Sequence, residues 1–186
     1  GTQIAYVANQ QLVVRNADGT GEPRVVARGL FGGPTWLPGD RGLIFTRLAA
    51  VGAPQDIYRL DFPDTVPRPV LATSFIERQP QVSPDGQWLA YTSNLSGTAE
   101  VYVQPFTTDG PRVRVSNAGG SAPRWSPDGR TLYYVIDGGL IAATRAPGAS
   151  FSIATRTTVI PSGISDLNAN NSNWAVHPDG KSFVYI

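Results

Sequence analysis

Short apolar runs alternate with turn-forming residues along the whole chain, and no apolar stripe with helical spacing persists for three turns. The most apolar runs are rich in β-branched and aromatic residues and have lost strict alternation; they cover residues 42–48, 88–94, 131–137 and 182–186. Runs of this kind predict strands that are buried on both faces. The pattern therefore indicates an all-β protein.

A four-residue turn recurs just before each of these runs. The copies are SPDG at 83–86 and 126–129, HPDG at 177–180 and a degenerate LPGD at 37–40. Pro presets φ, Asp accepts a hydrogen bond from the backbone two residues on, and Gly takes a positive φ. Each turn is thus predicted to join two strands as a hairpin. The four prolines lie 46, 43 and 51 residues apart, a period typical of stacked supersecondary units.

Each repeat holds up to four predicted strands. A short first strand precedes the turn, at 34–36, 80–82, 123–125 and 174–176, and the apolar run after the turn is the second. Third strands are predicted at 56–62, 100–106 and 139–145, and fourth strands at 68–74, 111–117 and 154–162. Such a sheet buries both faces only when neighbouring sheets stack against it. The predicted fold is a β-propeller of four-stranded antiparallel blades.

The repeat predicts about four to five blades within a single domain of residues 1–186. The predicted parts are a blade remnant at 3–29, blades at 32–74, 78–117 and 121–162, and closing strands at 173–186. Either a partial propeller or a minimal four-bladed ring fits this count. Open blade edges expose unpaired backbone groups, so a homo-oligomer through these edges is an alternative to closure within one chain. Trp36, Trp125 and Trp174 recur at equivalent positions and are predicted to pack blade against blade.

Composition narrows the possible partners. The 14 Arg and the single Lys181 are scattered among acids, and the net charge is only +1, which argues against a nucleic-acid partner. No apolar run approaches the ~20 residues that cross a bilayer, so this segment is not expected to insert into a membrane. The absence of Met indicates an excised or processed segment.

Candidate catalytic chemistry is sparse. The only histidine, His177, occupies a turn position equivalent to Ser83 and Ser126, and no Gly-x-Ser-x-Gly elbow accompanies it. The predicted innermost strands hold no carboxylate pair for glycoside hydrolysis, and the recurring turn aspartates are expected to bond to the turn backbone. With one His and no Cys, neither a metal site nor a cofactor is expected. The chain is therefore predicted to be non-catalytic.

The connections between blades are the predicted binding surface, because they gather at one mouth of a propeller channel. They cover residues 28–33, 72–78, 117–121 and 163–173. The candidate residues for binding a protein or a small ligand are Glu77, Arg78, Gln79, Gln81, Arg124, Asn171 and Asn173. Arginine donors suit carboxylate or phosphate groups, but pairing with Glu77 and nearby backbone is an equal alternative. The Asn-rich last connection is either ordered by a partner or a solvated connector.

Residues 122–134 (APRWSPDGRTLYY) resemble the PD40 repeat of TolB-like propellers almost position by position. Residues 79–186, and 88–106 (WLAYTSNLSGTAEVYVQPF) in particular, resemble the carboxyl-terminal propeller of bacterial transmembrane serine/threonine kinases. The resemblance implies an extracytoplasmic sensor or interaction domain of a larger bacterial receptor. Two alternatives are the gating propeller of a prolyl-oligopeptidase-like hydrolase that lacks its catalytic domain, and a TolB-like scaffold for envelope assembly.

Overall fold

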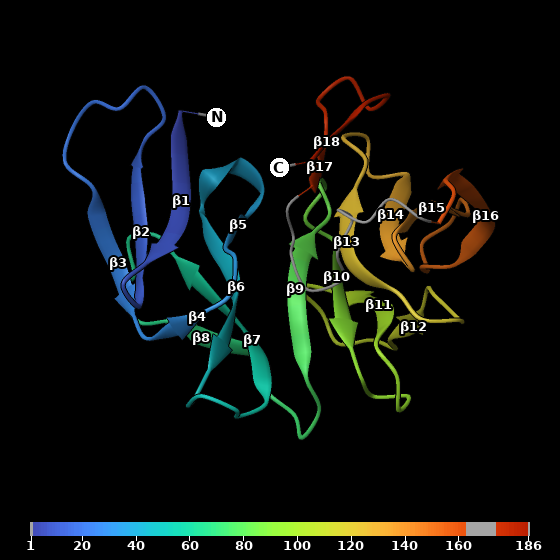
Figure 1. The fold of residues 1–186 in the computed structure, drawn as a ribbon, viewed down its shortest axis with the longest axis horizontal. Helices are drawn as coiled ribbons and strands as arrows, with labels where there is room; N and C mark the ends of the chain where they lie inside the picture. Colours follow the sequence, from blue (N-terminus) through green and yellow to red (C-terminus); the bar gives the residue numbers. More distant parts are fainter. Residues whose placement is uncertain (1, 163–173, 186) are drawn as a thin grey trace. The chain divides into compact units, whose positions relative to one another are not determined.

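The computed structural model describes residues 2–162 and 174–185, and these residues form strands joined by turns (Figure 1). Apart from one short 3-10 turn, η1 (Pro38–Asp40), the regular elements among the described residues are all strands. This confirms the all-β prediction. Contacts divide the chain into two compact units, Gly1–Pro80 and Gln81–Ile186.

The first unit holds two antiparallel sheets. One has the order β1-β2-β3, with bounds Gln3–Ala8, Gln11–Asn16 and Arg24–Arg28. The other is centred on β6 (Gly42–Leu48), which pairs with β7 (Gln55–Asp61), and β7 pairs in turn with β8 (Arg68–Leu71). The remaining edge of β6 is covered by two short strands, β4 (Leu30–Phe31) and β5 (Thr35–Trp36). The predicted first strand at 34–36 is therefore only the second half of an edge that begins at Leu30.

The core of the first unit lies between its two sheets. The buried side chains that form it are Leu12, Val14, Val26, Leu43, Phe45 and Leu60. Residues 42–46 of β6 are buried without interruption, which confirms the prediction that this strand is covered on both faces. The alternating pattern expected of a half-exposed strand is absent here because both faces of β6 are covered.

The second unit repeats one simple topology, in which neighbours in sequence are neighbours in the sheet. Its first sheet runs β9 (Glu77–Val82), which begins in the first unit, then β10 (Trp88–Ser93), β11 (Glu100–Pro105) and β12 (Val113–Arg114). Its second runs β13 (Ser121–Trp125), β14 (Thr131–Ile136), β15 (Gly139–Arg145) and β16 (Ile153–Ile160). A third sheet pairs β17 (Trp174–Val176) with β18 (Phe183–Tyr185). Four-stranded antiparallel blades are thus present as predicted.

The fourth strand of the first of these blades is much shorter than predicted. The sequence predicts a strand at 111–117, whereas β12 covers only Val113–Arg114. The cause lies in the backbone hydrogen bonds, because the N–H groups of Val115 and Ser116 both donate to the Val101 carbonyl, at 2.8 and 3.4 Å. The ladder therefore ends after two residues and the chain turns away.

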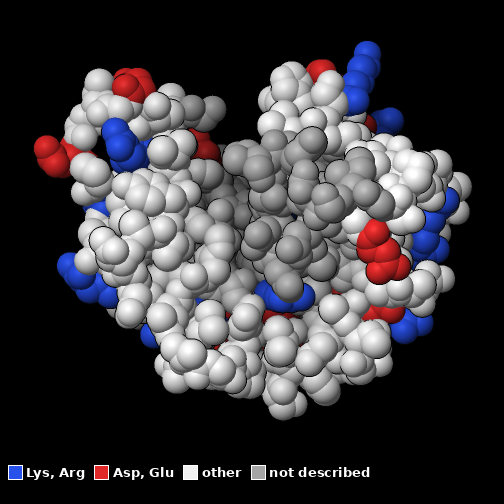
Figure 2. Space-filling model, viewed as in Figure 1, with Lys and Arg blue, Asp and Glu red and all other residues white. Residues whose placement is uncertain are grey.

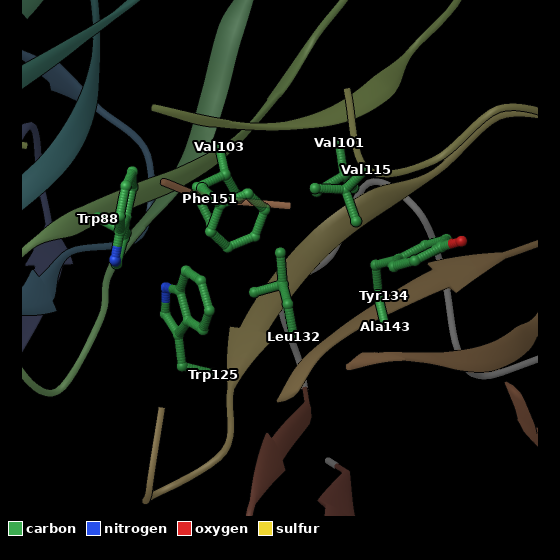
Figure 3. Close-up of a cluster of buried hydrophobic side chains, with 10 residues drawn as sticks. Trp88, Val101, Val103, Val115, Trp125, Leu132, Tyr134, Ala143 and Phe151 are labelled. Carbon is green, nitrogen blue, oxygen red and sulfur yellow. The ribbon is translucent and has the colours of Figure 1, made fainter. Parts of the chain in front are cut away.

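Three aromatic rings form the centre of the second unit's core (Figure 3). The ring of Phe151 lies 5.3 Å from that of Trp88 and 6.0 Å from that of Trp125. Trp88 belongs to β10 and Trp125 to β13, so Phe151 joins two neighbouring blades. The indole N–H of Trp125 also donates to the Gln81 carbonyl on β9, at 3.2 Å. These contacts confirm that Trp125 packs blade against blade.

The other two predicted tryptophans occupy related positions. Trp174 is 3% exposed and packs with Ala122, Val135 and Leu140 of the blade before it, as predicted. Trp36 is half-buried and packs against the core between the two sheets of the first unit, with its ring 6.1 Å from that of Phe62.

Candidate functional site

The Ser-Pro-Asp-Gly turns have identical hydrogen bonding in both complete copies. In the first, Gln87 N donates to Asp85 Oδ1 at 3.0 Å, and Gly86 has a φ of 73°. The Ser83 hydroxyl donates to Asp85 and accepts from Trp88 N at 2.9 Å. Asp and Gly thus act as predicted, while the bridging hydroxyl of Ser was not anticipated. The repetition of Ser at the first position of both copies was the sequence feature that could have indicated this role.

The two divergent copies keep the closing geometry of the turn. In the His177 copy, His177 N donates to the Ser182 carbonyl at 2.9 Å, and the side-chain Nδ1 accepts from Asp179 N at 3.3 Å, a different bond from that of the Ser hydroxyls. In the degenerate copy, Leu37 N donates to the Gly42 carbonyl at 2.9 Å, which matches the 2.8 Å bond from Ser83 N to the Trp88 carbonyl. These observations place the only histidine and the recurring aspartates in structural roles.

The turn carboxylates are expected to make stability depend on acid pH. The hydroxyl of Ser126, donating at 2.6 Å, and the backbone N–H of Arg130 lower the pKa of Asp128 from its usual 3.8. A lowered folded-state pKa contributes stability above the unfolded value, and this contribution is lost as the pH falls through the folded value. In the wild-type chain the urea concentration at the unfolding midpoint is expected to fall as the pH drops below 3.8, and in Asp128→Asn this fall is expected to be smaller. An unchanged acid slope in the variant would contradict this role.

The innermost strand β9 carries four of the candidate residues, three of which lie in the first unit. Glu77 is fully buried, and its Oε1 accepts a 2.6 Å hydrogen bond from the Thr73 hydroxyl in the preceding loop. Gln79 has a φ of 57°, and its backbone N–H donates to Thr46 Oγ1 at 3.2 Å. Arg78 is half-buried, and burial lowers its pKa. Glu77 therefore fixes the loop onto the strand, while Arg78 and Gln79 remain partly exposed to solvent.

Arg124 on β13 is directed largely at backbone. Its Nε donates to the Trp174 carbonyl at 3.3 Å and its Nη1 to the Pro123 carbonyl at 2.9 Å. Its guanidinium also lies 5.7 Å from the centre of the Trp174 ring. Burial lowers the pKa of Arg124 to about 10, so the group remains charged at neutral pH. For Arg124 the described contacts favour the alternative of pairing with nearby backbone.

The described residues do not bring the whole candidate set together. Glu77, Arg78 and Gln79 belong to the first unit, whereas Gln81, half-buried on β9, and Arg124 belong to the second. Asn171 and Asn173 lie outside the described residues. A joint binding role for these residues stays a prediction.

An apolar surface that sequence reasoning missed lies beside part of this set. Val51 is 90% exposed in the β6–β7 loop, and Phe75 and Ile76 are 36% and 38% exposed in the β8–β9 loop. Because β6 and β8 run in the same direction, both loops leave the same end of their sheet (Figure 1). We call residues 49–54 and 72–76 the apolar loop end. The sequence AAVGAP at 49–54 could have indicated this surface, because it has little polar character for a loop.

Charge is distributed without a dominant patch on the face shown in Figure 2, where basic and acidic side chains are interspersed. Within 2–162 and 174–185, no three His, Asp or Glu side chains group as metal ligands would. Over the same residues, no helix has the length and apolar character that crossing a bilayer requires.

Packed four-stranded antiparallel blades with a repeated hairpin turn define a β-propeller. The family described as PD40, TolB beta propeller domain, matches residues 1–186, and the chain belongs to this family. The resemblance of the repeat to PD40 is thereby confirmed.

Two relatives and one solved structure show the extent of the similarity. The chain is 32% identical over 94 residues to the Tol-Pal system protein TolB of Desulfosudis oleivorans, covering 49% of this chain and 22% of that protein. It is 32% identical over 100 residues to a TolB homolog of Chlorobaculum tepidum, covering 52% and 23%. The crystal structure of TolB from Acinetobacter baumannii superposes with a TM-score of 0.77 at 20% identity, covering 99% of this chain and 46% of that one. The chain thus spans about a quarter of the curated relatives' length.

Proposed function

We propose that this chain is a non-catalytic protein-interaction module within a larger extracytoplasmic bacterial protein, acting as a TolB-like scaffold in the cell envelope. The relative from Desulfosudis oleivorans carries the name of a Tol-Pal system protein, and membership of the propeller family supports a similar role here. Placement in a kinase receptor or beside a hydrolase domain is a narrower hypothesis. Sequencing of the parent reading frame distinguishes these contexts.

The apolar loop end is the observation that carries this proposal. An exposed aliphatic side chain is ordinary by itself, but a loop of Ala, Val and Pro at the same end of a sheet as an exposed Phe and Ile makes that end unusually apolar. Val51, at 90% exposed, is the most accessible of these side chains. Protein-binding loops on a propeller are held by a rigid scaffold, as the buried Glu77 and its bond to Thr73 hold the β8–β9 loop here.

The surface fits an apolar segment of a partner protein with polar groups at its rim. Arg78 follows the apolar residues Phe75 and Ile76 along the chain and is half-buried. Its guanidinium suits a carboxylate at the edge of such a contact. Aliphatic and aromatic side chains would then supply most of the affinity, and Arg78 the orientation.

A matched pair of valines tests this surface. Val66 is 71% exposed in the β7–β8 loop, at the opposite end of the same sheet from Val51. Val51→Asp is expected to lower capture of a specific envelope protein by about tenfold. The reason is that a charge would replace an apolar side chain that the bound partner covers. Val66→Asp is expected to leave capture unchanged. Capture is measured with purified variants on envelope extract, after thermal unfolding has shown that both are folded.

Equal capture by the two variants would remove the apolar loop end from the proposal. Capture that depends instead on Arg124→Glu, and not on Val51, would move the binding surface to the second unit.

A further inference from the structure

A pocket of about 410 Å³ opens in the second unit, at the end of its sheets that carries the Ser-Pro-Asp-Gly turns. Three segments line it: residues 87 and 88 after the first turn, residues 105, 107–111 and 113 around the β11–β12 connection, and residues 149–151 before β16. These segments come from two neighbouring blades. The volume falls within the range of small-molecule sites.

The walls of this pocket are fixed by the fold. Phe106 N donates to the Gln87 carbonyl at 2.8 Å, and Ala146 N donates to the Ser152 carbonyl at 2.9 Å. A Cβ added at Gly110 would lie only 2.6 Å from Cγ of Pro105, so the β11–β12 connection folds onto Pro105 because residue 110 is Gly. The pocket is therefore preorganised, which limits the entropy lost on binding.

The base of the pocket is aromatic and is not a feature of every repeat. Trp88 and Phe151 are 7% and 6% exposed, with ring centres 5.3 Å apart (Figure 3). The position of Trp88 is taken by Gly42 in the preceding repeat and by Thr131 in the following one. The aromatic base is thus particular to this pair of blades, as expected of a specific site rather than of the propeller scaffold.

The chemistry of the lining favours one class of ligand. Its apolar part is made by the aromatic rings with Pro105, Pro111 and neighbouring aliphatic groups, and Asp109 is its only ionisable side chain. No basic side chain is among the lining residues, and the Arg145 guanidinium stacks on the Trp88 ring, 5.1 Å from its centre, without lining the pocket. We propose that this pocket binds a small molecule that joins an apolar body to a protonated amine. The apolar body packs against the rings and prolines, and the ammonium group pairs with Asp109.

A pair of near-isosteric probes tests the proposal directly. 2-Phenylethylamine is protonated at neutral pH, whereas 2-phenylethanol has a similar shape without the charge. In ¹⁵N–¹H spectra, both are expected to shift the Trp88 indole and Gly110 amide signals at millimolar concentrations, with the amine binding about threefold more tightly. Asp109→Asn is expected to remove the preference for the amine. Asp64→Asn, an exposed acid in the other unit, is the control and should keep it.

Two results would overturn the proposal. One is the absence of saturable shifts at these two signals up to about 10 mM of either probe, the range in which fragments of this size bind. The other is equal affinity for both probes in the wild-type chain. Neither result bears on the apolar loop end, because the pocket does not depend on the proposed protein-binding function.

Discussion

Phe151→Ala is expected to lower the free energy of unfolding of the second unit by about 3–5 kcal/mol. The ring is 6% exposed and lies between Trp88 and Trp125, which belong to different blades. Its removal forfeits the burial of an aromatic side chain and leaves a cavity between two rigid indoles that cannot collapse into it. The two blades therefore lose a buried aromatic contact that they share.

Urea unfolding followed by tryptophan fluorescence measures this effect. Phe75→Ala is the matched control, because its ring is 36% exposed and it should change stability by less than about 1 kcal/mol. A loss below about 1 kcal/mol for Phe151→Ala, similar to the control, would show that the two blades do not depend on this ring.

Glu100→Ala is expected to cost about 3 kcal/mol, the second largest effect. Glu100 is 3% exposed at the start of β11. Its Oε2 accepts a hydrogen bond from the Ser116 hydroxyl and its Oε1 accepts one from Gly119 N at 3.1 Å. The Ser116 hydroxyl in turn accepts from Val101 N at 2.7 Å. Removing the carboxyl leaves the buried Ser116 hydroxyl and the half-buried Gly119 N–H without their acceptor.

Thermal and urea unfolding of three variants separates this network from a general effect of charge. Glu100→Gln keeps one carbonyl acceptor and is expected to lose about half as much as Glu100→Ala. Glu22→Ala, at an exposed position, is expected to change stability by less than about 0.5 kcal/mol. Similar losses for Glu100→Ala and Glu22→Ala would rule out the network as a source of stability.

Much of the fold was predictable because the turn repeat aligns the strands with one another. β6, β15 and β17 have the predicted bounds, and β10, β11 and β14 differ by one residue at one end. What failed were the edges of sheets. β4 was missed because glycines at 32 and 33 interrupt its pattern, and β12 was overextended because Val115 and Ser116 share one acceptor. The hydrophobic pattern of a segment does not show which carbonyl accepts the hydrogen bond of a backbone N–H at the edge of a sheet.

The candidate site was less predictable for a related reason. Sequence position indicated that Glu77 precedes an innermost strand and that Arg124 lies on one, but it did not show which partners they contact. Glu77 is buried against Thr73, and two donors of Arg124 are directed at backbone carbonyls. The exposed loop residue Val51 was overlooked because binding residues were sought only in the connections between blades, and residues 49–54 join two strands of one blade. Its exposure follows from its position beyond the end of β6, and the pairing of β6, β7 and β8 shows that it shares an end of the sheet with Phe75 and Ile76.

The most direct test of the central claim is site-specific photo-cross-linking in the cells that make this protein. A photoreactive side chain at position 51 reports on the apolar loop end, and the same side chain at position 66 reports on the opposite end of the same sheet. The account predicts one discrete cross-linked partner at position 51, lost when Phe75 is also changed to Asp, and none at position 66. Equal cross-linking at both positions, or none at position 51 with the protein folded and in the envelope, would contradict it.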